Sequence, residues 1–418
     1  MQEPLLHFAW RFQLFGKHTF ALEGGQHLRV IFPGYLNANQ GPDFLCARLD
    51  ISGVLWVGAV ELHLDSRDWY AHEHHRDPVY NAVVLHVVLR SAPQKPLRND
   101  GTEIPELVVA IPEDLDKRYS HFLNEKNTIL CRNFYSKNLD IVTNQWFTNL
   151  GIERLERKRV YWEAQKSTDT DYLELLWQAT AMAIAGPVNQ QPFQEAAQLV
   201  PFSLIRRYQG HPTQVSALLY GITRLLPQCS TDNYIQKLIY EWHFLQEKHQ
   251  LKKVTQSSCY FFRIRPPAFP TIRLAQLAAL VQYAPYWQLS SLMLSINTEL
   301  ISQDIHSYWK NHYVFEKITT PHSVCFTNDL SDLIQANARV PVQLAYFSSM
   351  KPEMIPTLLG FLEQVSPEKN RFVKYFETLN FTPKSMLQTQ GIVECVTQYC
   401  QHKRCLDCLI GQNILRLT

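Results

Sequence analysis

The sequence predicts an α+β protein in which a small α/β domain with a central mixed sheet, at about residues 1–130, precedes a mainly α-helical domain at about residues 131–418. Two patterns predict this division. Short apolar runs with strand spacing continue as far as Ile111, whereas apolar residues recur at helical spacing from about Asn144 onwards. With 46% hydrophobic and 19% charged residues among 418, the chain is expected to fold and to form more than one core.

The first part is expected to contain one helix followed by strands. Apolar residues crowd the segment from Glu3 to Phe15, which predicts a largely buried helix with Glu3 near its start. The polar and aromatic segment 67–81 is expected to be helix or loop, and a short helix is expected to end near Phe122. Strands are predicted for the runs HLRVIF (27–32), DFLCARLDI (43–51), VGAVELHL (57–64), VVLHVVL (83–89) and ELVVAI (106–111).

The second part is expected to be mainly helical. Its apolar residues have helical spacing in segments that are separated by Pro, Gly or Ser-Thr-Asp turn signals. The segments are 146–165, 172–185, 213–226, 233–248, 272–284 and 353–365. No internal repeat of fixed period is present.

Charge is distributed unevenly along the chain, whose net charge is +2. Residues 1–130 carry 12 Lys and Arg against 16 Asp and Glu, and the remainder carries 28 against 22. An acidic first part favours the binding of cations, so a polyanion would be bound mainly by the second part. Two ordinary surfaces of unequal charge explain the same numbers.

The sequence predicts a cytoplasmic protein without a membrane segment. No apolar run approaches the roughly 20 residues needed to cross a bilayer, and the N-terminus lacks a basic region followed by a continuous apolar core. Nine cysteines, an odd number, indicate reduced thiols or a metal cluster more than a secreted disulfide framework.

A strand at residues 57–64 would place two polar side chains side by side. Side chains alternate between the faces of a strand, so Glu61 and His63 share one face. Asp43 stands at the start of the preceding strand, and the short SGVLW connection predicts a hairpin that brings it across to Glu61. Two carboxylates and a basic group can form a divalent-metal site. A capping Asp and a solvent-facing strand explain the same residues.

Further imidazoles follow closely. His72, His74, His75 and His86, with Asp68 and Asp77, have the donor atoms of a transition-metal site, and a zinc hydrolase acting on a nonphosphate substrate is one interpretation of them. His-x-His spacing is also common in polar linkers, and His86, inside an apolar strand, is better explained as a hydrogen-bonded core residue.

Four cysteines lie within 14 residues near the C-terminus, and thiolates favour soft metals. They predict Zn²⁺ or an iron-sulfur cluster at Cys395, Cys400, Cys405 and Cys408, with Cys131 as a possible remote ligand in place of Cys395. Against this, residues five apart are poorly aligned on an α-helix, and buried cysteine is also a normal small apolar residue.

Arginines alternate with aromatic residues in the segment YFFRIRPPAFPTIRLAQLA. Arginine beside an aromatic ring can hold phosphates and stacked bases, so Arg263, Arg265 and Arg273 are candidate nucleic-acid-binding residues. A second basic patch, ERLERKRVYW, is better explained as a solvated helix face.

Several stretches taken together, among them LLHFAWRFQLF, GPDF, VELHLDSRDWYAHEHHRDPVYNAVVLHVV, RPPAFPTIRLAQLA and CQHKRCLDCLIG, resemble an uncharacterised bacterial domain-of-unknown-function family (DUF2851). This resemblance covers almost the whole chain and implies no activity.

A second, local resemblance lies within residues 1–112. Pro42-Asp43 followed by Glu61-Leu62-His63 is similar to the PD-(D/E)xK nuclease pattern, in which a helix supplies an optional acid and a β-hairpin supplies Asp and then Glu-x-Lys. The resemblance implies a nuclease-like domain with Glu3, Asp43, Glu61 and His63 as its catalytic residues, of which Asp43 and Glu61 hold Mg²⁺ or Mn²⁺.

His63 would replace the Lys of that pattern, and it is shorter and largely neutral at pH 7. Some members of that superfamily carry a four-cysteine iron-sulfur cluster, which parallels the cysteines here. The expected function is divalent-metal-dependent phosphodiester hydrolysis on DNA or RNA. The alternative is a noncatalytic nucleic-acid or protein interaction module that retains a degenerate nuclease fold.

Overall fold

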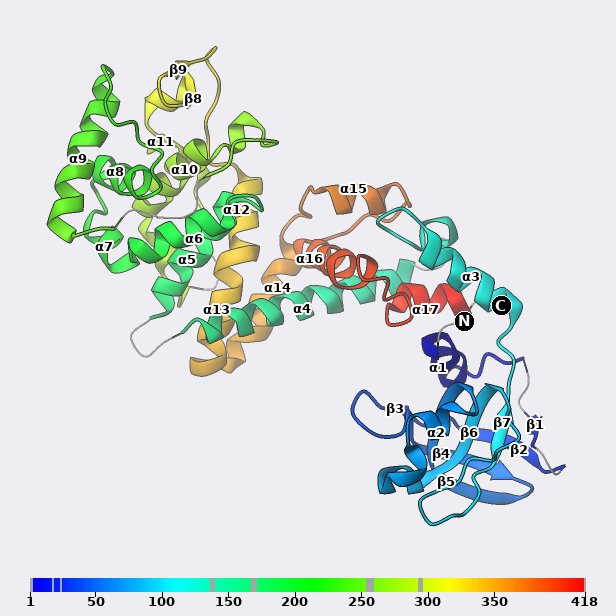
Figure 1. Cartoon of the computed structure of the whole chain (residues 1–418). Helices are drawn as coiled ribbons and strands as arrows, with labels where there is room; N and C mark the ends of the chain where they lie inside the picture. Colours follow the sequence, from blue (N-terminus) through cyan, green and yellow to red (C-terminus); the bar gives the residue numbers. More distant parts are fainter. Residues whose placement is uncertain are drawn as a thin grey trace. The chain divides into compact units, whose positions relative to one another are not determined.

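A computed structural model describes residues 3–16, 19–22, 25–135, 140–166, 171–252, 259–291 and 296–416 (Figure 1). The chain divides into two compact units: residues 1–146 with 395–418 form unit 1, and residues 147–394 form unit 2. The end of the chain therefore returns to the unit in which the chain begins. The sequence suggested two consecutive domains with a boundary at about residue 130, and so did not assign residues 395–418 to the first of them.

Unit 1 is built on a mixed sheet, which confirms the expected fold class. Its strands lie in the order β1-β2-β4-β5-β6-β7, with β3 paired to β4. The pairs from β1 to β5 are antiparallel, and β5, β6 and β7 run parallel to one another. The bounds are β1 Thr19–Ala21, β2 His27–Phe32, β3 Tyr35–Leu36, β4 Phe44–Ile51, β5 Val54–Asp65, β6 Val83–Arg90 and β7 Glu106–Val108.

The expected hairpin joins β4 to β5 through a two-residue turn. Ser52 and Gly53 both have positive φ, 51° and 85°, which is the requirement of a type I′ turn and matches the twist of the two strands. The resulting register pairs Phe44 with Val60. Asp43, just before β4, therefore arrives next to Glu61 on β5.

Short helices complete unit 1. Helix α1 buries an apolar face and packs against β5. The crossover between the parallel strands β5 and β6 contains the short helices α2, η1 and η2, and its α2 packs against β5. The bounds are α1 Glu3–Arg11, α2 Asp68–Ala71, η1 His74–Arg76, η2 Pro78–Ala82, α3 Glu113–Asn124, η3 Arg132–Phe134, the π-helix η10 Cys395–Cys400 and α17 Leu409–Arg416.

Unit 2 is helical, as expected, around a large apolar core of Leu, Ile, Ala and aromatic side chains. Helix α4 (Asp140–Ala164) enters it from unit 1. The other helices are α5 Tyr172–Ala185, α6 Gln190–Leu199, α7 Phe202–Arg207, α8 Pro212–Ile222, α9 Asn233–His249, α10 Pro270–Gln282, α11 Thr298–Gln303, α12 Asn328–Ile334, the π-helix η8 Gln335–Arg339, α13 Val340–Met350, α14 Ile355–Gln364, α15 Arg371–Glu377 and α16 Met386–Glu394.

Short 3-10 turns and one small hairpin connect these helices: η5 Pro266–Ala268, η6 Ala284–Trp287, η7 Ser307–Lys310, η9 Pro352–Met354, β8 His312–Val314 and β9 Lys317–Ile318. Within the described ranges of the chain, no helix combines the length and the apolar character needed to cross a membrane.

Candidate functional site

The carboxylates of Asp43 and Glu61 lie next to each other because each accepts a hydrogen bond from the other's strand. The backbone N–H of Asp43 donates to Glu61 Oε2 (3.0 Å), and the backbone N–H of Leu62 donates to Asp43 Oδ2 (2.9 Å). Glu61 is 5% exposed, and burial together with the neighbouring charge of Asp43 raises its pKa against the opposing effect of His74. Two acids this close, one of them buried, favour a bound cation or proton.

Helix α1 adds two side chains to this pair. His7 lies one helical turn after Glu3, and its Nε2 is 3.7 Å from Glu3 Oε1 and 3.3 Å from Asp43 Oδ2. Burial lowers the pKa of His7, but the charges of Asp43, Glu3 and Glu61 outweigh it and raise the pKa overall. The structure thus brings Glu3 to the site through His7.

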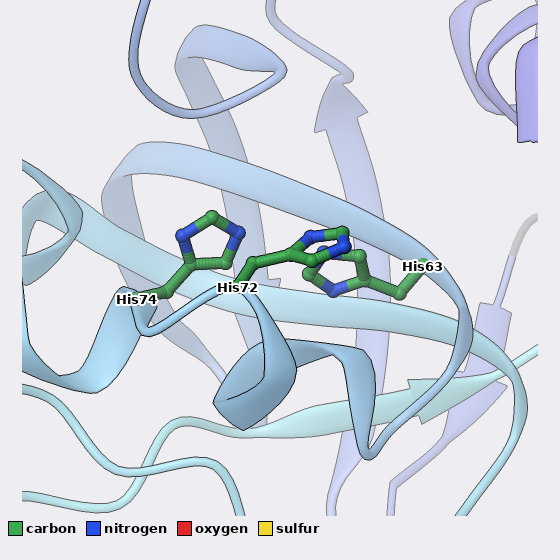
Figure 2. A group of neighbouring side chains, drawn as sticks. All are labelled: His63, His72 and His74. Atoms are coloured by element: carbon green, nitrogen blue, oxygen red, sulfur yellow. The ribbon is translucent and has the colours of Figure 1, made fainter.

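Three imidazoles lie next to one another (Figure 2), and two of them lie close to Glu61. His63 comes from β5, and His72 and His74 come from the segment that follows α2. One ring nitrogen of each can be chosen so that all three lie within 4.8 Å of one another. Glu61 Oε1 lies 3.3 Å from His74 Nε2 and 3.7 Å from His63 Nε2, so the carboxylate faces the group of imidazoles.

A buried relay of hydrogen bonds fixes the orientation of His63. Glu106 accepts hydroxyl hydrogen bonds from Ser66 and Ser91, and its Oε2 lies 3.0 Å from His86 Nδ1. His86 Nε2 in turn lies 2.8 Å from His63 Nδ1. Burial alone would raise the pKa of Glu106, but these hydrogen bonds outweigh it and lower the pKa, so Glu106 is a carboxylate that can only accept.

The relay also determines which nitrogen of His63 carries a proton. In the His86 tautomer that donates Nδ1–H to Glu106, the Nε2 lone pair of His86 faces His63 Nδ1, which then carries the proton of His63. Burial and the surrounding imidazoles lower the pKa of His63 to about 2, so its ring is neutral. His63 therefore presents an unprotonated Nε2 towards Glu61. The register Glu61–His86–Glu106 across β5, β6 and β7 makes this alignment a property of the sheet.

Aromatic rings hold the imidazoles in place. Tyr80 stacks on His74 with ring centroids 3.8 Å apart, and the fully buried Trp69 packs edge-on against His74 at 5.4 Å. Trp69 Nε1–H donates to the carbonyl of Leu97, and this hydrogen bond fixes the position of the indole ring beside His74. A rigid wall of this kind is what a preorganised site requires.

Not every member of the expected zinc set joins the group. His75 packs against Tyr70, Asp68 accepts from the backbone N–H of Asp65, and Asp77 caps η2 by accepting from Val79. These three side chains belong to local structure. His86 is a hydrogen-bonded core residue, as its position inside an apolar strand predicted.

Among the cysteines near the C-terminus, Cys395 interacts with both Cys400 and Cys408, and a backbone feature that could not be predicted from the sequence contributes to this. Cys395 and Cys400 are the first and last residues of a π-helix, whose hydrogen bonds join residues five apart, so the two thiols lie one turn apart. The misalignment expected for an α-helix is therefore removed. Hydrogen bonds to Cys400 and Cys408 raise the pKa of Cys395.

Cys408 lies immediately before α17, where the backbone N–H groups of Ile410 and Gly411 point at its sulfur. The hydrogen bond from Cys395, together with these N–H groups, lowers its pKa. Burial raises the pKa of Cys405 and of Cys131, both of which interact with Cys408 and Cys400. Cys131 is thus a fifth thiol of the group.

The three candidate nucleic-acid-binding arginines have different surroundings in unit 2. Arg263 and Arg265 are exposed, and Arg263 lies over the ring of Phe262 at 5.1 Å. Arg273 on α10 donates to Gln276 and borders a cavity of about 200 Å³ whose lining includes Asp329 and other acids. Acidic lining does not suit a phosphate, so only the first two are placed for one.

Sequence reasoning missed His7, Glu106, Ser66 and Ser91. The Glu3-x-x-x-His7 spacing on one helix face was a usable signal for His7. The partnership of Glu106 with His86 depends on the register of a parallel pair, which spacing alone does not give.

The fold and the site together define an α+β protein with a buried carboxylate and imidazole cluster on the parallel part of a mixed sheet. The chain belongs to the family described as protein of unknown function (DUF2851), whose model matches residues 3–371. That match includes the cluster and ends before Cys395. Neither the curated proteins nor the solved structures contain a match to this chain.

Proposed function

We propose that unit 1 hydrolyses phosphodiester bonds of nucleic acid with a divalent metal ion, at the site formed by Glu3, Asp43, Glu61 and His63. The observation that carries the proposal is the reciprocal pair of hydrogen bonds that places the Asp43 and Glu61 carboxylates side by side. Mg²⁺ and Mn²⁺ bind oxygen ligands, and a metal between two carboxylates can lower the pKa of a bound water and neutralise charge on a phosphate.

The arrangement of elements supports the same proposal. A helix that carries an acid, an antiparallel hairpin that carries Asp43 and Glu61, a short helical crossover and a parallel strand follow one another in unit 1. This is the order that the resemblance to PD-(D/E)xK nucleases implies. The neighbouring His7 would keep Glu3 and Asp43 oriented when a metal is bound.

His63 would act differently from the Lys of that pattern. A neutral imidazole cannot supply a fixed positive charge, and a ring whose pKa is lowered to about 2 is too weak a base to take a proton from water, but its unprotonated Nε2 can accept a hydrogen bond from the water and orient it. Of the two roles expected for it, base and water-orienting group, the second is the one proposed, and the metal would supply the positive charge.

The direct test is cleavage of single- and double-stranded DNA and RNA with Mg²⁺ or Mn²⁺, by wild type, Asp43→Asn, Glu61→Gln and the control Asp50→Asn on the far end of β4. Loss of about 10²-fold or more in rate for the two site variants, and none for the control, is expected. Thermal melts of each variant show that it is folded. Cleavage unaffected by either site substitution rejects the assigned roles.

The alternative, an interaction module without activity, predicts another outcome of the same experiment. Nucleic-acid or protein binding that needs no divalent ion, with no turnover over the full substrate panel, would favour it. The exposed Arg263 and Arg265 are the proposed phosphate-binding residues of unit 2. Replacing both with Ala is expected to weaken nucleic-acid binding for every sequence. The slope of log affinity against log salt concentration should become shallower by about one for each arginine removed.

We also propose that Cys395, Cys400, Cys405 and Cys408 hold Zn²⁺ or an iron-sulfur cluster, with Cys131 as an additional thiol. The convergence of the thiols through the π-helix and the N-terminus of α17 supports this. Elemental analysis and visible absorption of anaerobically purified protein distinguish zinc from iron. A folded sample with neither metal would reject the site.

A further inference from the structure

The imidazole side of Glu61 includes His72 and His74, which the proposed hydrolysis does not use. His63 Nε2 is unprotonated because of the relay from Glu106, yet it lies 3.7 Å from a carboxylate oxygen, so two lone pairs face each other. His74 Nε2 is buried and has no hydrogen-bond partner of acceptable geometry among the described residues, although Glu61 Oε1 is 3.3 Å away. A cation between these atoms would satisfy all of them at once.

The donor atoms indicate which class of cation fits. Mg²⁺ takes oxygen ligands in an octahedral shell, whereas imidazole nitrogen suits zinc and neighbouring transition metals. Three imidazoles that approach within 4.8 Å of one another, with one facing carboxylate, have the composition of a site with mostly protein ligands. His72 is exposed, so this side of the site opens to solvent and leaves room for water or substrate.

We propose that His63, His72 and His74, together with Glu61, bind one borderline transition-metal ion, Zn²⁺ in the first instance. The rings come from two segments, β5 and the crossover after α2, and Figure 2 shows them next to one another. This site goes beyond the proposed hydrolysis, since it requires neither a phosphodiester substrate nor Mg²⁺.

Glu106 and His86 act as positioning residues for this metal. A histidine ligand usually donates its other N–H to an acceptor that fixes the tautomer and increases its basicity, and loss of such a partner lowers metal affinity about 10- to 100-fold. Here the acceptor is His86 Nε2, which is itself oriented by the Glu106 carboxylate. The two hydroxyl donors Ser66 and Ser91 keep that carboxylate in place.

The experiment measures metal binding by the full-length protein after removal of bound metal with a chelator. Zn²⁺ is titrated by calorimetry, and Co²⁺ is titrated as a spectroscopic probe because its visible absorption reports nitrogen ligands and coordination number. The variants are His72→Ala and Glu106→Gln, and the matched controls are His121→Ala and Glu103→Gln, which replace exposed residues of unit 1 outside the cluster. All are compared in a Cys395→Ser, Cys408→Ser background, so that thiols do not compete.

We expect one Zn²⁺ per chain in the background protein, at least tenfold weaker binding in His72→Ala and in Glu106→Gln, and unchanged binding in both controls. Nitrogen NMR of the metal-free protein is expected to show the His63 proton on Nδ1. Absence of Zn²⁺ and Co²⁺ binding, or equal affinity in all five proteins, overturns the proposal. Because His72 is exposed, its variant decides the question even where Glu106→Gln does not fold.

Zinc binding without nuclease activity leaves the metal site established and rejects only the phosphodiester hydrolysis. Cleavage that depends on Asp43 and Glu61 with Mg²⁺ but not on His72, in a protein that binds no Zn²⁺, gives the reverse result. The two proposals therefore fail separately.

Discussion

Two regions bury charged groups, and they do so in opposite ways. In unit 2, Glu394 is 1% exposed and accepts hydrogen bonds from Arg154 (3.3 Å) and Arg157 (2.6 Å), which face it from α4. In unit 1, Glu61 is 5% exposed and accepts a hydrogen bond from the backbone N–H of Asp43, but its nearest side chains are the acid Asp43 and the imidazoles of His63 and His74. One carboxylate has its counter-charges in the chain, and the other has none of comparable strength.

This difference in partners indicates a structural role for Glu394 and a candidate binding site at Glu61. A buried charge with hydrogen-bonded partners of opposite sign is complete within the protein. A buried carboxylate that faces a second acid and an unprotonated imidazole raises the free energy of the fold unless something from outside joins it. Sites that bind ligands commonly have this property, and the unit 1 cluster has it while the unit 2 cluster does not.

The largest effect expected from this comparison is on unit 2. Glu394→Ala leaves the guanidinium of Arg154, which is largely buried, without its carboxylate, and we expect a loss of about 3 kcal/mol in the free energy of unfolding. Urea unfolding followed by circular dichroism measures it, and the exposed Glu353→Ala is the control. A loss below about 1 kcal/mol would mean that the ion pairs of Glu394 with Arg154 and Arg157 contribute little to the stability of unit 2.

The opposite sign is expected in unit 1. Glu61→Gln replaces a buried carboxylate with an amide whose N–H can donate to His63 Nε2, so the metal-free protein is expected to gain about 1 to 2 kcal/mol of stability. The same variant is expected to lose the rise in melting temperature that Zn²⁺ gives the wild type. A metal-free Glu61→Gln protein that is less stable than wild type would contradict the strained state assigned to this cluster.

Much of the fold follows from local patterns. The alternating and apolar runs predicted the strands that became β2, β4 and β6 to within one residue at each end, because side-chain period and turn residues are properties of short stretches. The strand predicted at residues 57–64 is longer in the structure, where β5 spans Val54–Asp65. β1 and β3 were not predicted, since three- and two-residue strands contain too little pattern. The helices of unit 2 followed from apolar spacing in the same way.

The site was predictable where it depends on one hairpin, and not beyond it. Asp43, Glu61 and His63 meet because a two-residue turn and strand alternation are local rules. The relay through Glu106 needs the register of two parallel pairs, which is set by the whole sheet.

Two other features were hidden for physical reasons. A π-helix at Cys395–Cys400 cannot be inferred from spacing that assumes an α-helix. The basic stretch ERLERKRVYW was expected to be a solvated helix face, but its Arg154 and Arg157 pair with a buried acid more than 230 residues further on, as only the folded chain shows.

Lys158 lies near Arg154 and Arg157, so its substitution tests whether three positive charges around the single carboxylate of Glu394 lower the stability of unit 2. Its ammonium group donates to Asn337 Oδ1, and burial, with Arg154 nearby, lowers its pKa well below the usual range. Lys158→Met keeps the length of the side chain and removes the charge, so we expect a gain of about 1 kcal/mol in stability. The double variant with Glu394→Ala should be more stable than Glu394→Ala alone, because less unpaired charge remains; a less stable double variant would show that Lys158 supports the cluster.

Glu174 on α5 lies between the two extremes, because its half-buried carboxylate accepts hydrogen bonds from neutral partners only. Its Oε2 accepts from the backbone N–H of Phe202 and its Oε1 accepts from Gln178, while burial raises its pKa above 4.5. A raised pKa means that the folded state holds the proton more tightly, so the stabilisation from protonated Glu174 is complete below pH 4.5 and is lost as pH rises through the folded pKa. The stability of wild type relative to Glu174→Gln should therefore fall between pH 4 and pH 7, by less than the changes above, whereas Glu353→Gln should show no such trend. Urea unfolding at a series of pH values measures this difference in the free energy of unfolding. If wild type instead became more stable relative to Glu174→Gln as pH rises, the ionised form of Glu174 would be the stabilising one, as it is for Glu394.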